Sequence, residues 1–275
     1  MTLTDPPGIC IAGLLPEPLS PTKEALAAAL AASADAGFAE MSSWAWLLPM
    51  MAADGTHAGA AAALGRMGLR VRMVEAAFAW ATGASDEEAR ADAATVAGIA
   101  EAVGASLVMA VCLEPTIPDR ARAQARLAEV ADRARAVGAR TCVEFLPWSA
   151  IPGLRDAWDL VAPLDDVGLI VDMWHWQRQP GGPATDALKD VPPERVYCLQ
   201  LADAPAQAEG ELMEETMTAR LLPGDGDVDY GPVKEWLAGA APFVAPEVFN
   251  GGLVVRRGVG PLAAATYEAA VRVMA

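Results

Sequence analysis

Short, almost uninterrupted apolar runs alternate along the chain with longer, alanine-rich stretches whose apolar residues recur at helical spacing. Near-continuous apolar runs are typical of parallel strands covered on both faces. They predict strands near residues 8–14, 38–43, 69–75, 106–112, 140–146, 168–172, 195–201 and 243–249. Helices are expected at about 22–36, 56–67, 86–103, 118–137, 153–162, 184–190, 230–240 and 260–274. This alternation predicts an α/β fold, a (β/α)8 TIM barrel, in a single domain over residues 1–275.

A glycine separates several predicted helices from the apolar run that follows. The clear cases are Gly37, Gly68, Gly104 and Gly138, and Gly168 is a looser fifth copy. Their spacing of about 30 to 36 residues matches one βα unit. Glycine at the end of a helix indicates a left-handed backbone conformation. An open doubly wound sheet is the alternative, but no GxGxxG motif follows the first strand to support it.

Composition narrows the range of partners and locations. A formal net charge of -16 argues against nucleic acid and against an anionic membrane surface. No apolar stretch reaches the roughly 20 residues of a membrane-spanning helix, and the N-terminus lacks the basic start of a secretory signal. The four cysteines lie in apolar runs without CxxC spacing, which indicates reduced core residues. We therefore expect a cytoplasmic protein with a small-molecule substrate, and the alanine-rich helix faces are compatible with a homodimer.

Polar side chains stand near the ends of the last four predicted strands: Glu144, Asp172, Gln200 and Glu247. In a TIM barrel the carboxyl ends of the strands form the functional site. Three carboxylates brought together would repel one another unless a cation lay between them. An oxygen-only ligand set suits Mg²⁺ or Mn²⁺, and Co²⁺ is an option. The sequence therefore predicts a metal site, with separately solvated carboxylates as the alternative.

Three residues near these strand ends are candidates for binding substrate. His175 follows Asp172 by three residues and can hold or transfer a substrate proton near neutral pH, although a structural histidine is the more common case. Arg178 would orient an acid or a substrate oxygen, or else be solvated. Arg220 begins the Pro-, Gly- and Asp-rich segment 219–231, which we interpret as a loop over the substrate rather than a plain surface loop.

The chain has eight tryptophans, and six of them follow predicted strand ends. Trp44, Trp148 and Trp176 are predicted to line a substrate pocket, which would suit sugar rings or aromatic substrates. The same region has few lysines and arginines, so a phosphate-bearing substrate is not expected. Glu75 and Glu114, near the ends of the third and fourth strands, are possible additional site residues, although a structural role is the better interpretation for both.

These motifs resemble those of the xylose isomerase-like TIM-barrel family, the sugar phosphate isomerase/epimerase group, over essentially the whole chain. The resemblance rests on Glu144, on "DMWH" from Asp172, on "QLAD" from Gln200, on "RLLPGDG" from Arg220, and on Glu247. It implies one divalent metal bound by Glu144, Asp172, Gln200 and Glu247. It also implies that Glu144 and Glu247 act as catalytic residues by moving protons. Many family members have histidine where this chain has Gln200.

The implied function is a divalent-metal-dependent isomerase or epimerase acting on a sugar or a related hydroxy-carbonyl compound. The family's dehydratase branch, including dehydroshikimate dehydratases, resembles the same Glu-Asp-Gln-Glu set, so a dehydratase is the alternative. A barrel that binds a ligand without catalysis is the second alternative. DNA-repair endonucleases of the superfamily are a poorer match, because two histidines cannot supply a histidine-rich multi-zinc centre.

Overall fold

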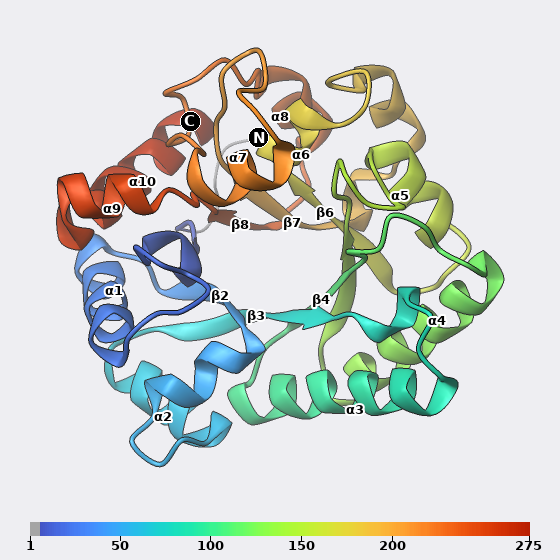
Figure 1. The fold of residues 1–275 in the computed structure, drawn as a ribbon, viewed down its shortest axis with the longest axis horizontal. Coiled ribbons are helices and arrows are strands. Elements are labelled where there is room, and N and C mark those ends of the chain that lie inside the picture. Colours follow the sequence, from blue (N-terminus) through green and yellow to red (C-terminus); the bar gives the residue numbers. More distant parts are fainter. Residues whose placement is uncertain (1–5) are drawn as a thin grey trace.

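Eight parallel strands, paired in chain order, form the centre of the computed structural model, which describes residues 6–275 (Figure 1). The strands are β1 (Ile9–Cys10), β2 (Glu40–Trp44), β3 (Arg70–Ala77), β4 (Leu107–Val111), β5 (Arg140–Glu144), β6 (Val167–Asp172), β7 (Val196–Leu201) and β8 (Phe243–Pro246). The amide of Gly8 donates to the carbonyl oxygen of Val244 at 2.8 Å, which connects the first and last strands. The predicted TIM barrel is confirmed.

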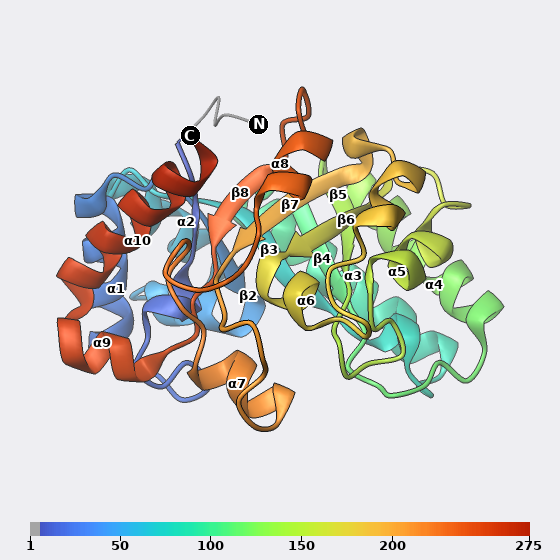
Figure 2. The ribbon, with the colours of Figure 1, turned by 90° about the horizontal axis from the view of Figure 1, so that it is seen from above.

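Helices surround the strands and cover their outer faces (Figures 1 and 2). They are α1 (Lys23–Ala36), α2 (His57–Arg66), α3 (Asp86–Val103), α4 (Arg120–Ala136), α5 (Leu154–Val161), α6 (Met173–Arg178), α7 (Leu212–Thr218), α8 (Gly231–Trp236), α9 (Gly251–Arg257) and α10 (Val259–Met274). Ser85 and Glu88 form the capping box expected at the start of α3. Figure 2 shows α7 at one end of the barrel and the C-terminus at the other.

Hydrophobic residues pack in two clusters. The larger lies between the strands and the helices, and the smaller consists of residues from strands and strand ends, among them Met73, Met109, Ile170 and Phe243. Since side chains alternate along a strand, the smaller cluster fills the interior of the barrel. The filled interior leaves the ends of the strands as the place where polar side chains gather.

Several predicted boundaries were wrong. Only Ile9–Cys10 of the first apolar run is a strand, and Ile11–Leu14 is a 3-10 helix. The run is buried throughout, so its apolar character reports burial and not conformation. The last strand, β8, ends at Pro246, earlier than predicted. The helix predicted at 184–190 is a 3-10 helix (Thr185–Asp190). The short helices α6, α7 and α9 were not predicted.

The glycine pattern holds in four copies and fails in the fifth. Gly37, Gly68, Gly104 and Gly138 have φ angles of 99°, 76°, 67° and 83°, the predicted left-handed conformation. Gly168 instead lies within β6, and the positive φ of 59° falls on Asp166.

Close packing explains why residue 168 is a glycine. A Cβ atom there would lie 2.5 Å from the ring of Tyr197 and 2.6 Å from the carbonyl oxygen of Arg195. The position therefore requires a residue without a side chain, although its backbone is not left-handed.

No helix among residues 6–275 is long and apolar enough to cross a bilayer. Residues 1–5, on which the expectation about a signal peptide partly rests, lie outside the described part of the chain.

Candidate functional site

The four predicted ligand residues come from neighbouring strands at one end of the barrel. Glu144 and Asp172 are the last residues of β5 and β6, and Asp172 is in register with Gln200 of β7. Glu247 directly follows β8. All four are buried. The parallel, in-order pairing of the strands brings together side chains that are up to about a hundred residues apart in sequence.

Arg220 lies at the centre of this group. Its Nη1 atom is 2.7 Å from Asp172 Oδ2 and 3.2 Å from Glu247 Oε2, and it also donates to the carbonyl oxygen of Glu247 at 3.1 Å. Its Nη2 atom donates to Thr216 Oγ1 at 2.8 Å and lies 3.5 Å from His175 Nε2. The start of the predicted loop thus lies inside the acidic cluster.

His175 lies beside two of the carboxylates. Its backbone N–H donates to Asp172 Oδ1 at 2.9 Å, and its Nε2 atom is 3.7 Å from Glu144 Oε1. The rings of Trp148 and Trp174 contact the imidazole edge-to-face, with centroids at 5.4 and 5.3 Å. Burial lowers the pKa of His175 to about 3, with Arg220 acting in the same direction. The imidazole is therefore neutral at physiological pH.

The carboxyl groups differ in how they are stabilised. Burial raises the pKa of Glu144 well above its usual range, and Glu247 and Asp172 add to the shift. Burial also raises the pKa of Glu247, to about 8, although Arg220 opposes it. Burial acts on Asp172 in the same direction, but Arg220 and His175 outweigh it and hold its pKa below the ordinary value. At neutral pH Asp172 is ionised, while Glu144 and Glu247 hold protons readily.

The predicted ligand set fits a divalent cation. Glu144 Oε1 and Gln200 Oε1 are buried and accept no hydrogen bond. The Gln200 side chain is oriented by its Nε2 atom, which donates to Glu247 Oε1 at 2.8 Å. Buried oxygen atoms without partners are costly, and a hard cation would satisfy them. Glu144, Asp172 and His175 also offer ligand atoms within 4.8 Å of one another.

Arg178 contacts Glu215 rather than the carboxylates of this cluster, and its contact with substrate stays a prediction. Arg178 is buried and paired with Glu215, with Nε and Nη2 at 2.8 and 2.5 Å from Oε1. A guanidinium that is fully engaged in this way anchors α7 to α6. The sequence could not show this, because Glu215 is 37 residues further along the chain.

Asp203, the last residue of "QLAD", organises the segment that follows Arg220. Its carboxylate accepts backbone hydrogen bonds from Ala204, Gly224 and Val228 at 2.9, 2.8 and 2.9 Å. The loop is therefore held by a buried carboxylate rather than left free on the surface.

The predicted pocket tryptophans lie in different surroundings. Trp148 contacts His175, as described above. Trp44 stacks between Trp46 and Phe249, with both ring-centroid distances at 5.8 Å. Trp176 is 1% exposed and belongs to the larger hydrophobic core, so its predicted contact with substrate has no support from its position.

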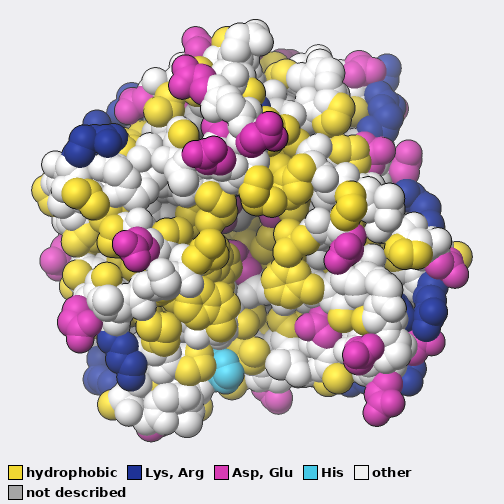
Figure 3. All heavy atoms as spheres, viewed as in Figure 1, with side chains coloured by type: hydrophobic (Ala, Val, Ile, Leu, Met, Phe, Trp, Pro, Cys, Tyr) yellow, Lys and Arg dark blue, Asp and Glu magenta, His cyan; other side chains and the backbone are white. Residues whose placement is uncertain are grey.

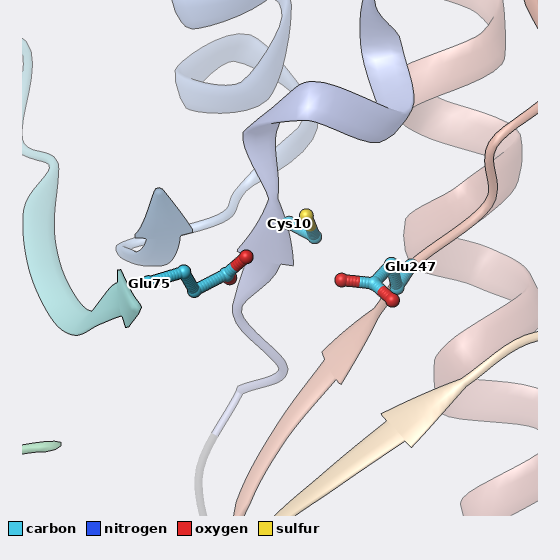
Figure 4. Close-up of side chains that lie close together, drawn as sticks. All are labelled: Cys10, Glu75 and Glu247. Atoms are coloured by element: carbon cyan, nitrogen blue, oxygen red, sulfur yellow. The ribbon is translucent and has the colours of Figure 1, made fainter. Parts of the chain in front are cut away.

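Glu75, interpreted from sequence as structural, belongs to the same barrel end, and so does Cys10. Both are buried, and their side chains lie with Glu247 in a second group of ligand atoms within 4.8 Å of one another. Figure 4 shows Glu75 and Glu247 extending toward the end of β1 from opposite sides, with Cys10 between them. Their strand-end positions were the available signal. Glu114, in contrast, is exposed.

Apolar side chains surround the opening. Figure 3 shows them around the central hollow, while lysines and arginines lie toward the edge of this face. Exposed apolar residues follow several strand ends: Leu19, Trp46, Phe78, Leu113, Met213 and Val255. The surroundings of the acidic cluster are therefore poor in cations that would bind a phosphate group.

Comparison with known proteins agrees with the fold. The family model described as xylose isomerase-like TIM barrel matches residues 28–274. The chain belongs to the xylose isomerase-like TIM barrel family, as its motifs indicated.

Two curated relatives share part of the sequence. This chain is 35% identical to a 3-dehydroshikimate dehydratase of Pseudomonas aeruginosa over 128 residues. The matched region is 46% of this chain and 18% of the relative. The chain is also 32% identical to the 3-dehydroshikimate dehydratase of Pseudomonas putida over 120 residues, 42% of this chain and 18% of that protein. The matched region is thus less than a fifth of either relative.

Solved structures repeat the same architecture at lower identity. A xylose isomerase-like TIM barrel/4-hydroxyphenylpyruvate dioxygenase fusion protein superposes with a TM-score of 0.78 at 20% identity, covering 98% of this chain and 42% of the other. The IOLI protein, whose structure has a bound zinc atom, superposes with a TM-score of 0.73 at 18% identity. The match covers 100% of this chain and 96% of the IOLI chain. A D-psicose 3-epimerase from Clostridium cellulolyticum H10 superposes with a TM-score of 0.68 at 17% identity. The match covers 89% of this chain and 92% of the epimerase chain. These structures show the shared fold.

Proposed function

We propose that this protein is a divalent-metal-dependent dehydratase that removes water from a β-hydroxy carbonyl compound, as its 3-dehydroshikimate dehydratase relatives are named to do. The observation that carries the proposal is the buried set Glu144, Asp172, Gln200 and Glu247, in a chain 35% identical over 128 residues to such an enzyme. The comparison favours dehydration over the isomerase or epimerase that the sequence patterns placed first.

The cation would be held by the oxygen atoms of Glu144, Asp172, Gln200 and Glu247, with Mn²⁺ or Mg²⁺ preferred for such donors. When bound, it would polarise the substrate's carbonyl oxygen and so acidify the adjacent C–H group.

Glu144 is suited to take the proton from that carbon. Its raised pKa makes its carboxylate a stronger base than an exposed glutamate, and its Oε1 atom has no hydrogen-bond partner. As the C–H electron pair becomes the new C=C bond, the C–O bond at the β-carbon breaks. Glu247, whose pKa is raised by burial, is suited to supply the proton with which the hydroxyl group leaves as water.

Two further groups would position the substrate. Arg220 holds Asp172 and Glu247 in place and keeps a positive charge among the carboxylates. The neutral imidazole of His175, packed between Trp148 and Trp174, has an Nδ1 atom that is buried and without a hydrogen-bond partner. It is available to hydrogen-bond a substrate hydroxyl.

Epimerisation is the second candidate, because both glutamates have raised pKa values and can exchange a proton on either side of one carbon. The test is to load the protein with Mn²⁺, add 3-dehydroshikimate in deuterated water, and follow the conjugated product by absorbance and the substrate by NMR. Loss of water supports the dehydratase. Deuterium uptake at a substrate carbon without loss of water supports the epimerase instead.

Variants connect the reaction to the site. Glu144→Gln should lower kcat/KM by about 10²–10⁴, the usual contribution of a general base. The exposed Glu114 provides a matched control, since Glu114→Gln should keep wild-type turnover. Wild-type turnover by Glu144→Gln would refute its role.

A further inference from the structure

We propose that Cys10, Glu75 and Glu247 form a second metal site, which contains a thiolate and shares Glu247 with the first. The inference rests on the proposed function in one respect, because Glu247 is also a ligand of the metal proposed there. Two of the three ligands, Cys10 of β1 and Glu75 of β3, lie outside the motifs of the second half of the chain that indicated the first site.

The arrangement of donors supports it. Cys10 Sγ and carboxylate oxygens of Glu75 and Glu247 lie within 4.8 Å of one another, and all three residues are buried. A zinc ion bound by oxygen and sulfur ligands at bond lengths of ~2.0–2.3 Å needs donor atoms that lie this close together. In Figure 4 the two carboxyl groups approach from opposite sides of the end of β1.

An unpartnered buried atom points independently to a ligand. Ser42 and Trp44 interact with the Glu75 carboxyl group, but its Oε1 atom has no hydrogen-bond partner although the residue is only 4% exposed. A buried carboxylate oxygen without a partner is costly in a folded protein, so an atom in this state indicates a missing ligand.

Glu247 is able to serve both sites. Its Oε1 accepts from Gln200 and its Oε2 from Arg220, yet each carboxylate oxygen has a second lone pair. Carboxylates that bridge two cations ~3.5–4 Å apart are a regular feature of two-metal centres.

Burial raises the pKa of the Cys10 thiol well above its ordinary value, with Glu75 and Glu247 acting in the same direction, so its proton would be released only when a metal binds. The sulfur donor then determines the kind of metal. A sulfur donor with two carboxylates favours Zn²⁺ or Co²⁺ over Mg²⁺ and Mn²⁺, which the oxygen-only site prefers. The two sites should therefore differ in metal preference.

The experiment is a Co²⁺ titration of chelator-treated protein, followed by metal analysis and by the near-ultraviolet charge-transfer band of thiolate-bound cobalt. Wild-type protein should bind about two equivalents and show the band. Cys10→Ser should lose the band and one equivalent, and Glu75→Gln should weaken Co²⁺ binding at the same site. The matched control is Cys112→Ser, at a buried cysteine whose thiol donates a hydrogen bond to the carbonyl oxygen of Glu114. This variant should keep the band and both equivalents of Co²⁺. Circular dichroism checks that each variant folds.

Asp172→Asn separates this inference from the proposed function, because it should lose the other equivalent and retain the band. One equivalent without a thiolate band in wild-type protein would refute the second site and leave the first intact. A band that persists in Cys10→Ser would also refute it. No Co²⁺ binding at all would overturn both proposals.

Discussion

Arg178 of α6 and Glu215 of α7 form a buried ion pair through two contacts to one carboxylate oxygen. The other oxygen of Glu215 accepts from the backbone amide of Glu209 at 3.0 Å. The next residue, Thr216, receives hydrogen bonds from Arg220 through both its hydroxyl and its carbonyl oxygen. The pair thus fixes the helix that holds Arg220 among the carboxylates.

Breaking this pair should therefore destabilise the fold. Glu215→Gln removes the charge that compensates a buried guanidinium, so the free energy of unfolding should fall by about 3–5 kcal/mol. Urea denaturation measures the loss. The control is Asp186→Asn, which removes an exposed partner of Arg155 and should cost less than ~1 kcal/mol. Equal effects of the two substitutions would contradict the assigned role.

Asp203 should control the order of the loop after Arg220. Its carboxylate accepts the amides of Ala204, Gly224 and Val228, and Asp203→Asn places an amide group opposite these donors. We expect a loss of about 2–4 kcal/mol and faster hydrogen exchange at Gly224 and Val228. Asp229→Asn, at an exposed acceptor of a single amide in the same loop, should leave that exchange nearly unchanged. Unaltered protection in Asp203→Asn would show that the loop is ordered by other contacts.

Two glycine substitutions should have opposite effects. Gly168→Ala would press a methyl group against Tyr197 and the carbonyl oxygen of Arg195, and overpacking of this kind costs about 1–3 kcal/mol. Gly98 is an exposed residue within α3 with open space around it, so Gly98→Ala should stabilise the protein by about 0.5–1 kcal/mol. Thermal unfolding of both variants tests the pair, and a stabilised Gly168→Ala would contradict the packing.

The sequence predicted most of the barrel because its signals are local. Apolar runs, helix caps and the left-handed glycines depend on residues within one βα unit. The grouping of the strand-end side chains could also be predicted, since parallel strands in chain order place Glu144 and Asp172 at the same edge. The role of Gly168 could not, because it depends on Tyr197 in the neighbouring strand. Nor could the group of Cys10 and Glu247, which the closure of β1 on β8 brings together across most of the chain.

The ion pairs of Asp86 give a pH-dependent prediction. Asp86 begins α3, and its Oδ1 atom accepts from Arg122 and Arg126 of α4, each at 2.9 Å from Nε. Hydrogen bonds from Arg126 and Arg122 hold the pKa of Asp86 below its ordinary value. A carboxyl group whose pKa is lower in the folded than in the unfolded state stabilises the fold above its unfolded pKa of about 3.9. That contribution is lost as the pH falls through the folded-state value.

Wild-type protein should therefore melt at a higher temperature than Asp86→Asn at pH 6–8, and the difference should shrink below about pH 4. Because Asp86 is exposed, 1 M NaCl should reduce the difference at neutral pH. A difference that grows as the solution is acidified would contradict the sign of the shift.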